Sequence, residues 1–174
     1  MKLHHEERAL IFETEHFIIR QATLDDVHSF VSFWNDPEVM KFLGDGTWGG
    51  GPKVVEKLLS EAIDFYSAHP GFGSWVTEDK ATKQVAGEAS LGCLTETGEI
   101  EAGFILSKTH WGRGLGTELL QGLLKYGFAK LNADHIVAVC HPDNLGSIKV
   151  LEKCGMAFVG EVVNDGVRVY KYRV

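Results

Sequence analysis

The glycine-punctuated stretch IEAGFILSKTHWGRGLGT (residues 100–117) constrains the fold of this chain more than any other part of the sequence. It begins with short apolar residues typical of a strand, passes through a polar turn and runs into a helical pattern. Gly112, Gly114 and Gly116 lack a Cβ, so the backbone here can turn tightly and approach a bulky anion. Because the first amides of a helix have no intrahelical acceptor and Arg113 adds a positive charge, the stretch predicts a pyrophosphate site.

Spacing argues against two familiar nucleotide-binding loops at this position. A Walker loop requires Gly-Lys-Ser/Thr after its glycines, and no such tripeptide follows Gly116. A dinucleotide-binding strand has the spacing GxGxxG and an acidic residue at the end of the next strand. Here the spacing is GxGxG, and Asp134 precedes the next expected strand. A tight strand-to-helix turn without a ligand stays open as the plainest interpretation of the glycines alone.

A second motif, NLGSIKVLEKCGM, follows at residues 144–156. Together with the WGRGLG turn, and with WNDPEV at residues 34–39, it resembles the Rim-type branch of the GNAT superfamily of N-acetyltransferases. That superfamily carries Arg/Gln-x-x-Gly-x-Gly/Ala after a strand, and this branch adds Asn-x-x-Ser…Glu-Lys-x-Gly-Phe. Trp111 replaces the usual Gln/Arg, a departure that is common in the branch. The resemblance covers nearly the whole chain.

The resemblance implies an α/β (α+β) fold: a mixed, mainly antiparallel, twisted sheet with helices on both faces and two central parallel strands that splay apart. We expect one N-acetyltransferase domain over residues 1–174, because 174 residues with 44% hydrophobic content suit one well-buried core. Acetyl-CoA would enter the gap between the splayed strands as co-substrate. The cofactor-binding residues implied by the resemblance are Ile105, Leu106, Trp111, Gly112, Arg113, Gly114, Leu115, Gly116, Thr117 and Asn144.

Acetyl transfer needs a base for the attacking amine, a donor to the oxyanion and a proton for the departing thiolate. Glu101 is the predicted base, because its offset from the glycine turn is similar to that of the catalytic glutamate in the superfamily's histone acetyltransferases. Glu88 is the reserve candidate and Asp165 a weaker one, while a structural role for Glu101 stays open. The predicted oxyanion donor is a main-chain amide near Ile105 or Leu106.

The motif at residues 144–156 supplies the remaining catalytic prediction. Many relatives place a tyrosine acid where this chain has Leu151, so Ser147, which Rim-type enzymes place near the sulfur, is assigned as the acid. Asn144 is expected to bind pantetheine or to orient a water, and it can cap its helix at the same time.

Two tryptophans are predicted to contact the substrate, together with Glu88. Trp34 lies on an apolar stripe of helical period, so core packing is its alternative role. Trp48 stands in GDGTWGGG (residues 44–51), which indicates either a flexible loop beside the substrate or a surface linker.

Composition limits the partners. With a net charge of -7, from 17 Lys and Arg against 24 Asp and Glu, the chain does not suit nucleic acid, whereas an acidic surface attracts a cationic amine. The three cysteines form no C-x-x-C and the eight histidines show no ligand spacing, so we expect neither metal nor disulfides. No signal-like or membrane-spanning run occurs, so a cytoplasmic protein is expected, as a monomer or homodimer.

The acceptor of the acetyl group is predicted to be a peptide N-terminus. Acetylation of a small amine, or a non-catalytic acyl-CoA sensor, stays open.

Hydrophobic periodicity predicts the regular elements. The expected strands lie at residues 17–20, 74–78, 85–94, 100–106, 135–140, 158–163 and 167–173. The expected helices begin after residues 23 and 36, near residue 55, at residue 117 and after residue 144. The strand at 135–140 should lie parallel to that at 100–106, because a helix connects them.

Overall fold

The computed structural model describes residues 8–44, 46, 49–94, 97–164 and 166–174. Its strands are β1 (Leu10–Glu13), β2 (Phe17–Arg20), β3 (Gly73–Asp79), β4 (Val85–Cys93), β5 (Ile100–Leu106), β6 (Ile136–Cys140), β7 (Ala157–Asn164) and β8 (Val167–Arg173). Its helices are α1 (Val27–Trp34), α2 (Pro37–Met40), α3 (Pro52–Ala68), α4 (Leu115–Leu131) and α5 (Leu145–Lys153), with 3-10 turns at Leu24–Asp26 and Lys108–His110. Every helix among these residues falls short of the length and apolar content of a membrane span.

The strands form one mixed sheet in the order β1-β2-β3-β4-β5-β6-β8-β7. All neighbours pair antiparallel except β5 and β6, which are parallel and joined through α4. The predicted fold class and the predicted parallel pair are therefore confirmed. The prediction missed β1, because this edge strand has four residues and a half-exposed pattern with too few positions to show a period.

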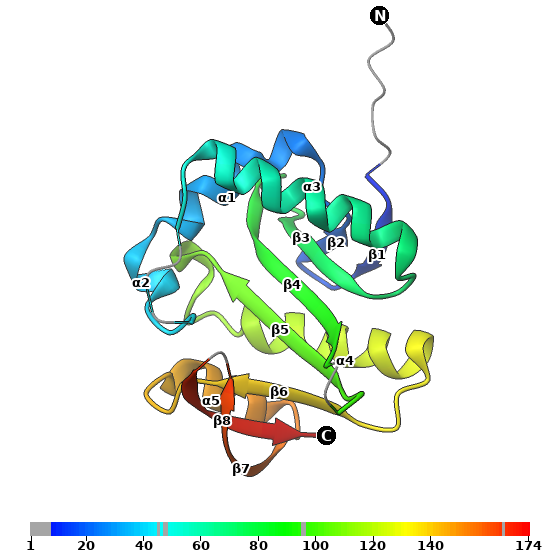
Figure 1. Ribbon diagram of the computed structural model, residues 1–174, viewed down its shortest axis with the longest axis vertical. Coiled ribbons are helices and arrows are strands. Elements are labelled where there is room, and N and C mark those ends of the chain that lie inside the picture. The colour runs from blue at the N-terminus through cyan, green and yellow to red at the C-terminus, as the bar shows by residue number, and fades with distance from the viewer. Residues whose placement is uncertain (1–7, 45, 47–48, 95–96, 165) are drawn as a thin grey trace, which may run out of the picture.

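The parallel strands β5 and β6 are paired only at their beginnings. The register joins Ile100 to Ile136 and Glu101 to Val137, and it ends there. On its other side β5 pairs with β4 along its whole length. In Figure 1 the two strands lie close together at the right and separate toward the left, which confirms the predicted splay.

Helices cover both faces of the sheet and create two cores (Figure 1). On one face α4 buries Leu119, Leu120 and Leu123 completely against the sheet. On the other face α1 and α3 bury an aromatic cluster that includes Phe30 and Trp34. A fully buried leucine side chain contributes about 1.5–3 kcal/mol, so α4 is held firmly behind the gap between β5 and β6.

A buried ion network fixes the start of α1 to the sheet. The Arg20 guanidinium donates to both carboxylate oxygens of Asp26, at 2.8 and 2.9 Å, and its Nε donates to Glu78 at 2.9 Å. Burial opposes the charge on Asp26, but the hydrogen bonds from Arg20 and from the Thr23 amide outweigh it and hold the pKa of Asp26 below its usual range. The Thr23 amide donates to Oδ2 of Asp26 at 2.9 Å, so the same carboxylate also holds the turn that leads into α1.

Candidate active site

A cavity of about 800 Å³ opens where β5 and β6 separate. Its walls come from the end of β5, the glycine turn with the start of α4, the end of β6, α5, and the segment around α2. The lining residues are Glu38, Val39, Lys41, Phe42, Leu43, Ala102, Gly103, Phe104, Ile105, Leu106, His110, Trp111, Gly112, Gly114, Leu115, Gly116, Thr117, Ala138, Val139, Cys140, His141, Asn144, Gly146, Ser147, Lys149, Val150, Leu151 and Lys153.

The glycine turn directs the start of α4 into this cavity. Gly112 and Gly114 have φ values of +70° and +78°, in the left-handed region that favours glycine. Because Gly114 takes the N-cap position, α4 begins at Leu115, earlier than the sequence predicted. Its first backbone hydrogen bond runs from the Glu118 amide to the Gly114 carbonyl at 3.1 Å. The preceding amides of the first turn have no intrahelical acceptor, so they form a site suited to phosphate oxygens.

Backbone contacts hold the chain between β5 and the glycine turn. The Ser107 amide donates to the Ala86 carbonyl at 2.8 Å. The Trp111 indole donates to the Leu106 carbonyl at 2.7 Å, although 44% of the Trp111 surface is exposed. At the neighbouring position of β4 only glycine fits, because a Cβ on Gly87 would lie 2.0 Å from the Ile105 carbonyl oxygen. The end of β5 is thus closely held on its β4 side and open on its β6 side.

The first turns of α5 form the opposite wall. The Asn144 side chain caps the helix by accepting from the Ser147 amide at 3.1 Å. Ser147 and Leu151 lie one turn apart, and both line the cavity. At the far end Gly155, with φ +79°, closes the helix, and the Met156 amide donates to the Leu151 carbonyl at 3.1 Å.

The two candidate carboxylates lie on the same face of the sheet but outside the described lining of the cavity. Glu88 pairs with Ile105, which does line it, and Glu101 pairs with Gly92 on one side and Val137 on the other. Glu88 is half-buried and accepts hydrogen bonds from the Ser74 hydroxyl and, at 3.2 Å, from the Trp34 indole. Burial raises the pKa of Glu88.

The other predicted residues are distributed as follows. The cofactor-binding residues and Ser147 line the cavity, except for Arg113, whose guanidinium lies 3.5 Å from the Thr109 carbonyl. Trp34 packs edge-on against Phe30, with ring centroids 5.1 Å apart, so it belongs to the core and also reaches Glu88. Trp48 and Asp165 lie outside the described residues. In the described part of the chain no His, Cys, Asp or Glu cluster could hold a metal ion.

Several lining residues were missed by sequence reasoning. Phe42 and His141 stack with ring centroids 5.4 Å apart, and Lys149 and Lys153 add positive charge from α5. His141 follows the end of β6, so the rule that ligands bind beyond the carboxyl ends of strands could have found it. Cys140 also lines the gap, but burial raises its pKa to about 11, so its thiol stays neutral.

Comparison with known proteins identifies the family. A profile of the Acetyltransferase (GNAT) domain family matches residues 16–157. YjdG of Bacillus subtilis (strain 168), described as an uncharacterized N-acetyltransferase, is 34% identical over 162 residues, which cover 88% of this chain and 92% of YjdG. The protein p20 of Bacillus licheniformis, also described as an uncharacterized N-acetyltransferase, is 30% identical over 139 residues, which cover 79% of this chain and 77% of p20.

Solved structures share the fold at lower identity. RimL, a ribosomal L7/L12 alpha-N-protein acetyltransferase in complex with coenzyme A, superposes with a TM-score of 0.80 at 16% identity, over 95% of this chain and 97% of RimL. A GNAT-family acetyltransferase from Bacillus anthracis superposes with a TM-score of 0.78 at 20% identity, over 93% of this chain and 96% of that protein. The chain therefore belongs to the GNAT acetyltransferase family and is an N-acetyltransferase.

Proposed function

We propose that this protein transfers the acetyl group of acetyl-CoA to a primary amine in the cavity between β5 and β6. One observation carries the proposal: the amides at the start of α4 and the open edge of β5 share a single cavity that also reaches Ser147 on α5. An anion site at one end and an unpaired strand edge further along suit a long ligand with a phosphate group at one end and amide groups behind it.

The residues present fit coenzyme A. The amides of Leu115, Gly116 and Thr117 would hold its pyrophosphate, and the lysines of α5 add charge to the same wall. Phe104 and Val139 give the gap apolar sides, and the edge of β5 beyond Glu101 offers main-chain partners for pantetheine. When bound, acetyl-CoA supplies an activated acetyl thioester.

The amide of Leu106 is the proposed oxyanion donor. Successive peptide groups in a strand point to opposite sides. Since the Ser107 amide donates to Ala86 of β4, the Leu106 amide points away from β4 and toward the gap. The same alternation turns the Ile105 amide toward its partner on β4, Glu88. A donor fixed in this way stabilises a developing negative charge without reorganising during the reaction.

Glu88 is the proposed base for the attacking amine, acting directly or through one water. Its neighbour on β5 is Ile105, at the cavity, and burial raises the pKa of Glu88, the direction that makes a carboxylate a stronger base. Glu101 lies four residues before Ile105, about 13 Å away at 3.3 Å per strand residue, and stays the alternative base on the same face. Ser147 is the proposed donor of a proton to the departing thiolate, because its hydroxyl belongs to the opposite wall.

The proposed acceptor is the N-terminal amine of a protein. RimL and a ribosomal-protein-S5-alanine acetyltransferase of Vibrio fischeri share this fold, and both act on ribosomal proteins. Small acceptors stay the alternative, since one relative at 27% identity is described as an FsC-acetyl coenzyme A-N(2)-transacetylase.

A thiol-release assay with acetyl-CoA tests the proposal. We expect release with peptides that begin with Ser or Ala, and no release with the same peptides blocked by an N-terminal acetyl group. Release with polyamines, amino acids or aminoglycosides instead of peptides would assign a small-amine enzyme. If coenzyme A binds but no amine causes release of its thiol, the protein would instead be a sensor of acyl-CoA.

A further inference from the structure

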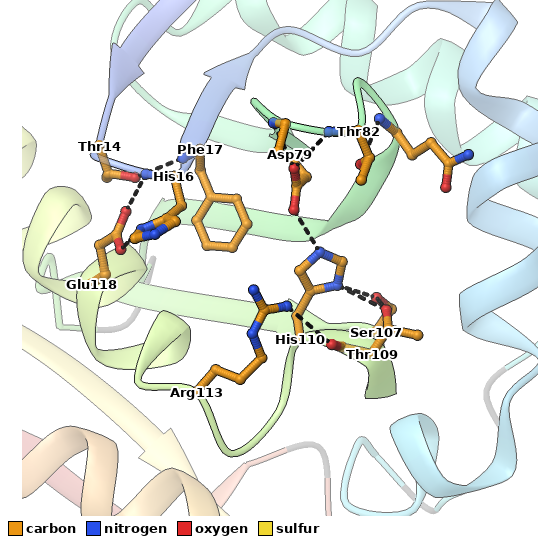
Figure 2. Close-up of polar contacts among 12 residues, drawn as sticks. Thr14, His16, Phe17, Asp79, Thr82, Ser107, Thr109, His110, Arg113 and Glu118 are labelled. Atoms are coloured by element: carbon orange, nitrogen blue, oxygen red, sulfur yellow. Dashed lines mark hydrogen bonds and ion pairs between the residues drawn. The ribbon is translucent and has the colours of Figure 1, made fainter.

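The His110 side chain links the loop before α4 to the far end of β3. Its Nε2 lies 3.1 Å from Oδ2 of Asp79, and its Nδ1 lies 2.8 Å from the Ser107 hydroxyl and 3.0 Å from the Thr109 hydroxyl. The side chains of His110 and Asp79 are each 12% exposed. Figure 2 shows the imidazole standing between the carboxylate on one side and the two hydroxyls on the other.

Hydrogen bonds fix the direction of this link. The Thr82 and Ala81 amides donate to Oδ1 of Asp79, at 2.9 and 2.8 Å, and with the contact from His110 they hold the pKa of Asp79 below its usual range. An ionised carboxylate only accepts, so Nε2 of His110 carries a proton and donates it to Oδ2. In that tautomer Nδ1 has one lone pair, which can accept from one of the two hydroxyls, that of Ser107 at 2.8 Å or that of Thr109 at 3.0 Å.

The anchor of the link is a rigid turn. The Asp79 amide donates to the Gln84 carbonyl at 2.9 Å, and the Lys83 amide donates to the Asp79 carbonyl at 2.8 Å. On the other side of the glycine turn, Glu118 of α4 accepts from the His16 amide at 2.8 Å and contacts Nδ1 of His16 at 2.7 Å (Figure 2). The glycine turn therefore lies between two side-chain anchors on the β1–β4 part of the sheet.

The line of Ser107, His110 and Asp79 has the residue types of a nucleophilic triad but not its geometry. In such a triad Nε2 faces the serine and Nδ1 faces the aspartate, whereas here the two nitrogens are exchanged. His110 lines the cavity, but Ser107 is not among the described residues that do. The arrangement suits holding a loop in place, not forming an acyl-enzyme.

We propose that His110 and Asp79 are positioning residues that hold the glycine turn in its coenzyme-binding conformation before the ligand arrives. The inference rests on the proposed function, because it concerns the affinity for coenzyme A. The other contacts that hold the described residues between β5 and α4 include backbone hydrogen bonds, the Trp111 indole on Leu106 and the more exposed ion pair of Lys108 with Glu38 at 2.5 Å. Without the His110 link, binding must also order the turn, which weakens affinity. The loss applies equally to the ground state and the transition state, so KM rises and kcat does not change.

Two substitutions of His110 test whether the hydrogen bond to Asp79 matters, or only the presence of a polar side chain at this position. In His110→Gln the terminal amide reaches as far as Nε2 and still donates to Asp79, whereas in His110→Asn it reaches only as far as Nδ1. His135→Asn is the matched control. His135 also contacts a carboxylate, Glu99, at 3.4 Å, but it lies at the opposite end of β5.

The readouts are the Kd of coenzyme A by isothermal titration and the kcat and KM for acetyl-CoA. We expect His110→Asn to raise both Kd and KM about tenfold with kcat within about twofold, which corresponds to about 1.4 kcal/mol. We expect His110→Gln to recover most of the affinity and His135→Asn to match the parent.

Equal affinity for His110→Asn and the parent would overturn the inference while leaving the proposed function intact. Equal losses for the Asn and Gln variants, or an equal loss in His135→Asn, would also overturn it, because the effect would not depend on the link to Asp79. Failure of the parent protein to bind coenzyme A would overturn the proposed function and the inference with it.

Discussion

The two ends of β5 are built from the same strand and differ in what surrounds them. At its start β5 pairs with β4 and β6 together, and the adjacent Glu99 holds Lys171 at 2.5 Å and His135 at 3.4 Å. At its end β5 keeps β4 but loses β6, and the Trp111 indole bonds to the Leu106 carbonyl instead.

The contrast explains why the proposed coenzyme A site lies at one end of β5. A buried backbone amide needs a partner. At the closed end of β5 the partner is a strand, and at the open end the amides beyond Glu101 face a cavity that a ligand can fill. The proposed site therefore depends largely on sheet hydrogen bonds that β5 does not make, and side chains from α2, α5 and the glycine turn line the rest of it.

The largest effect on coenzyme A binding is expected from a change in the backbone next to the open end of β5, in the glycine turn. Gly114→Val places a β-branched residue at φ +78° and displaces the amides that follow it. Strain of about 1–2 kcal/mol, added to lost hydrogen bonds to a charged group of about 1.5–3 kcal/mol, predicts that the Kd of coenzyme A rises about 100-fold or more. Titration calorimetry measures the change.

Gly92→Ala is the control at the closed end, where Gly92 pairs with Glu101. A Cβ there would meet nothing within 4 Å, so the Kd should match that of the parent. Equal Kd values for Gly114→Val and the parent would remove the glycine turn from the binding site.

Sequence reasoning found the parts of the cavity that belong to contiguous motifs better than the parts that tertiary packing brings in. The glycine turn, Ser147 and Asn144 could be predicted because each belongs to a contiguous motif whose spacing carries the information. The strands from β3 onward could be predicted because their apolar runs are long enough to show a period. Lys41 and Phe42 could not be predicted, since they reach the cavity only through tertiary packing, and neither could the link from His110 to Asp79. No local pattern joins residues that far apart in the chain.

The two carboxylates on the face of β4 and β5 give the next effect. We expect Glu88→Gln to lower kcat/KM about 100-fold at neutral pH, the lower range for a general base. The residual activity should approach the parent at alkaline pH, where the amine is already deprotonated. Glu101→Gln is the matched variant near the closed end, and pH profiles of both enzymes decide between them. A loss in Glu101→Gln alone would move the base to Glu101.

The same Glu88 variant should change stability with pH in a defined direction. Burial raises the pKa of Glu88, so its ionisation in the folded state is unfavourable. The stability of the parent relative to Glu88→Gln should be highest below about pH 4.3, the ordinary pKa of a glutamate, and should fall as pH rises through the raised folded pKa. Because the Ser74 hydroxyl can accept from the new amide, the variant keeps its contacts. Urea unfolding at several pH values measures the difference, and a constant difference would mean that the pKa of Glu88 is not raised in the folded protein.

Ser147 lies on the α5 side of the gap and tests the chemical step apart from coenzyme A binding. We expect Ser147→Ala to lower kcat about tenfold with an unchanged Kd for coenzyme A, because the leaving thiolate needs a proton only in the transition state. The capping bond to Asn144 uses the Ser147 amide, so the variant keeps it. An unchanged kcat in Ser147→Ala would mean that solvent, and not Ser147, protonates the departing thiolate.

The smallest effect is expected at the closed end of β5. Glu99 contacts Lys171 at 2.5 Å, and that hydrogen bond, with a smaller one from Thr97, lowers the pKa of Glu99. The side chains of Glu99 and Lys171 are 16% and 19% exposed, so Glu99→Gln should cost about 1 kcal/mol of unfolding free energy at neutral pH. A lowered pKa contributes stability that is present above the ordinary value of about 4.3 and is lost as pH falls through the folded pKa, so the unfolding free energies of parent and variant should converge in acid.

The Kd of coenzyme A should not change in Glu99→Gln, since the pair of Glu99 and Lys171 lies where β5 and β6 are still joined. A weakened Kd in Glu99→Gln would contradict the separation of β5 into a structural end and a binding end.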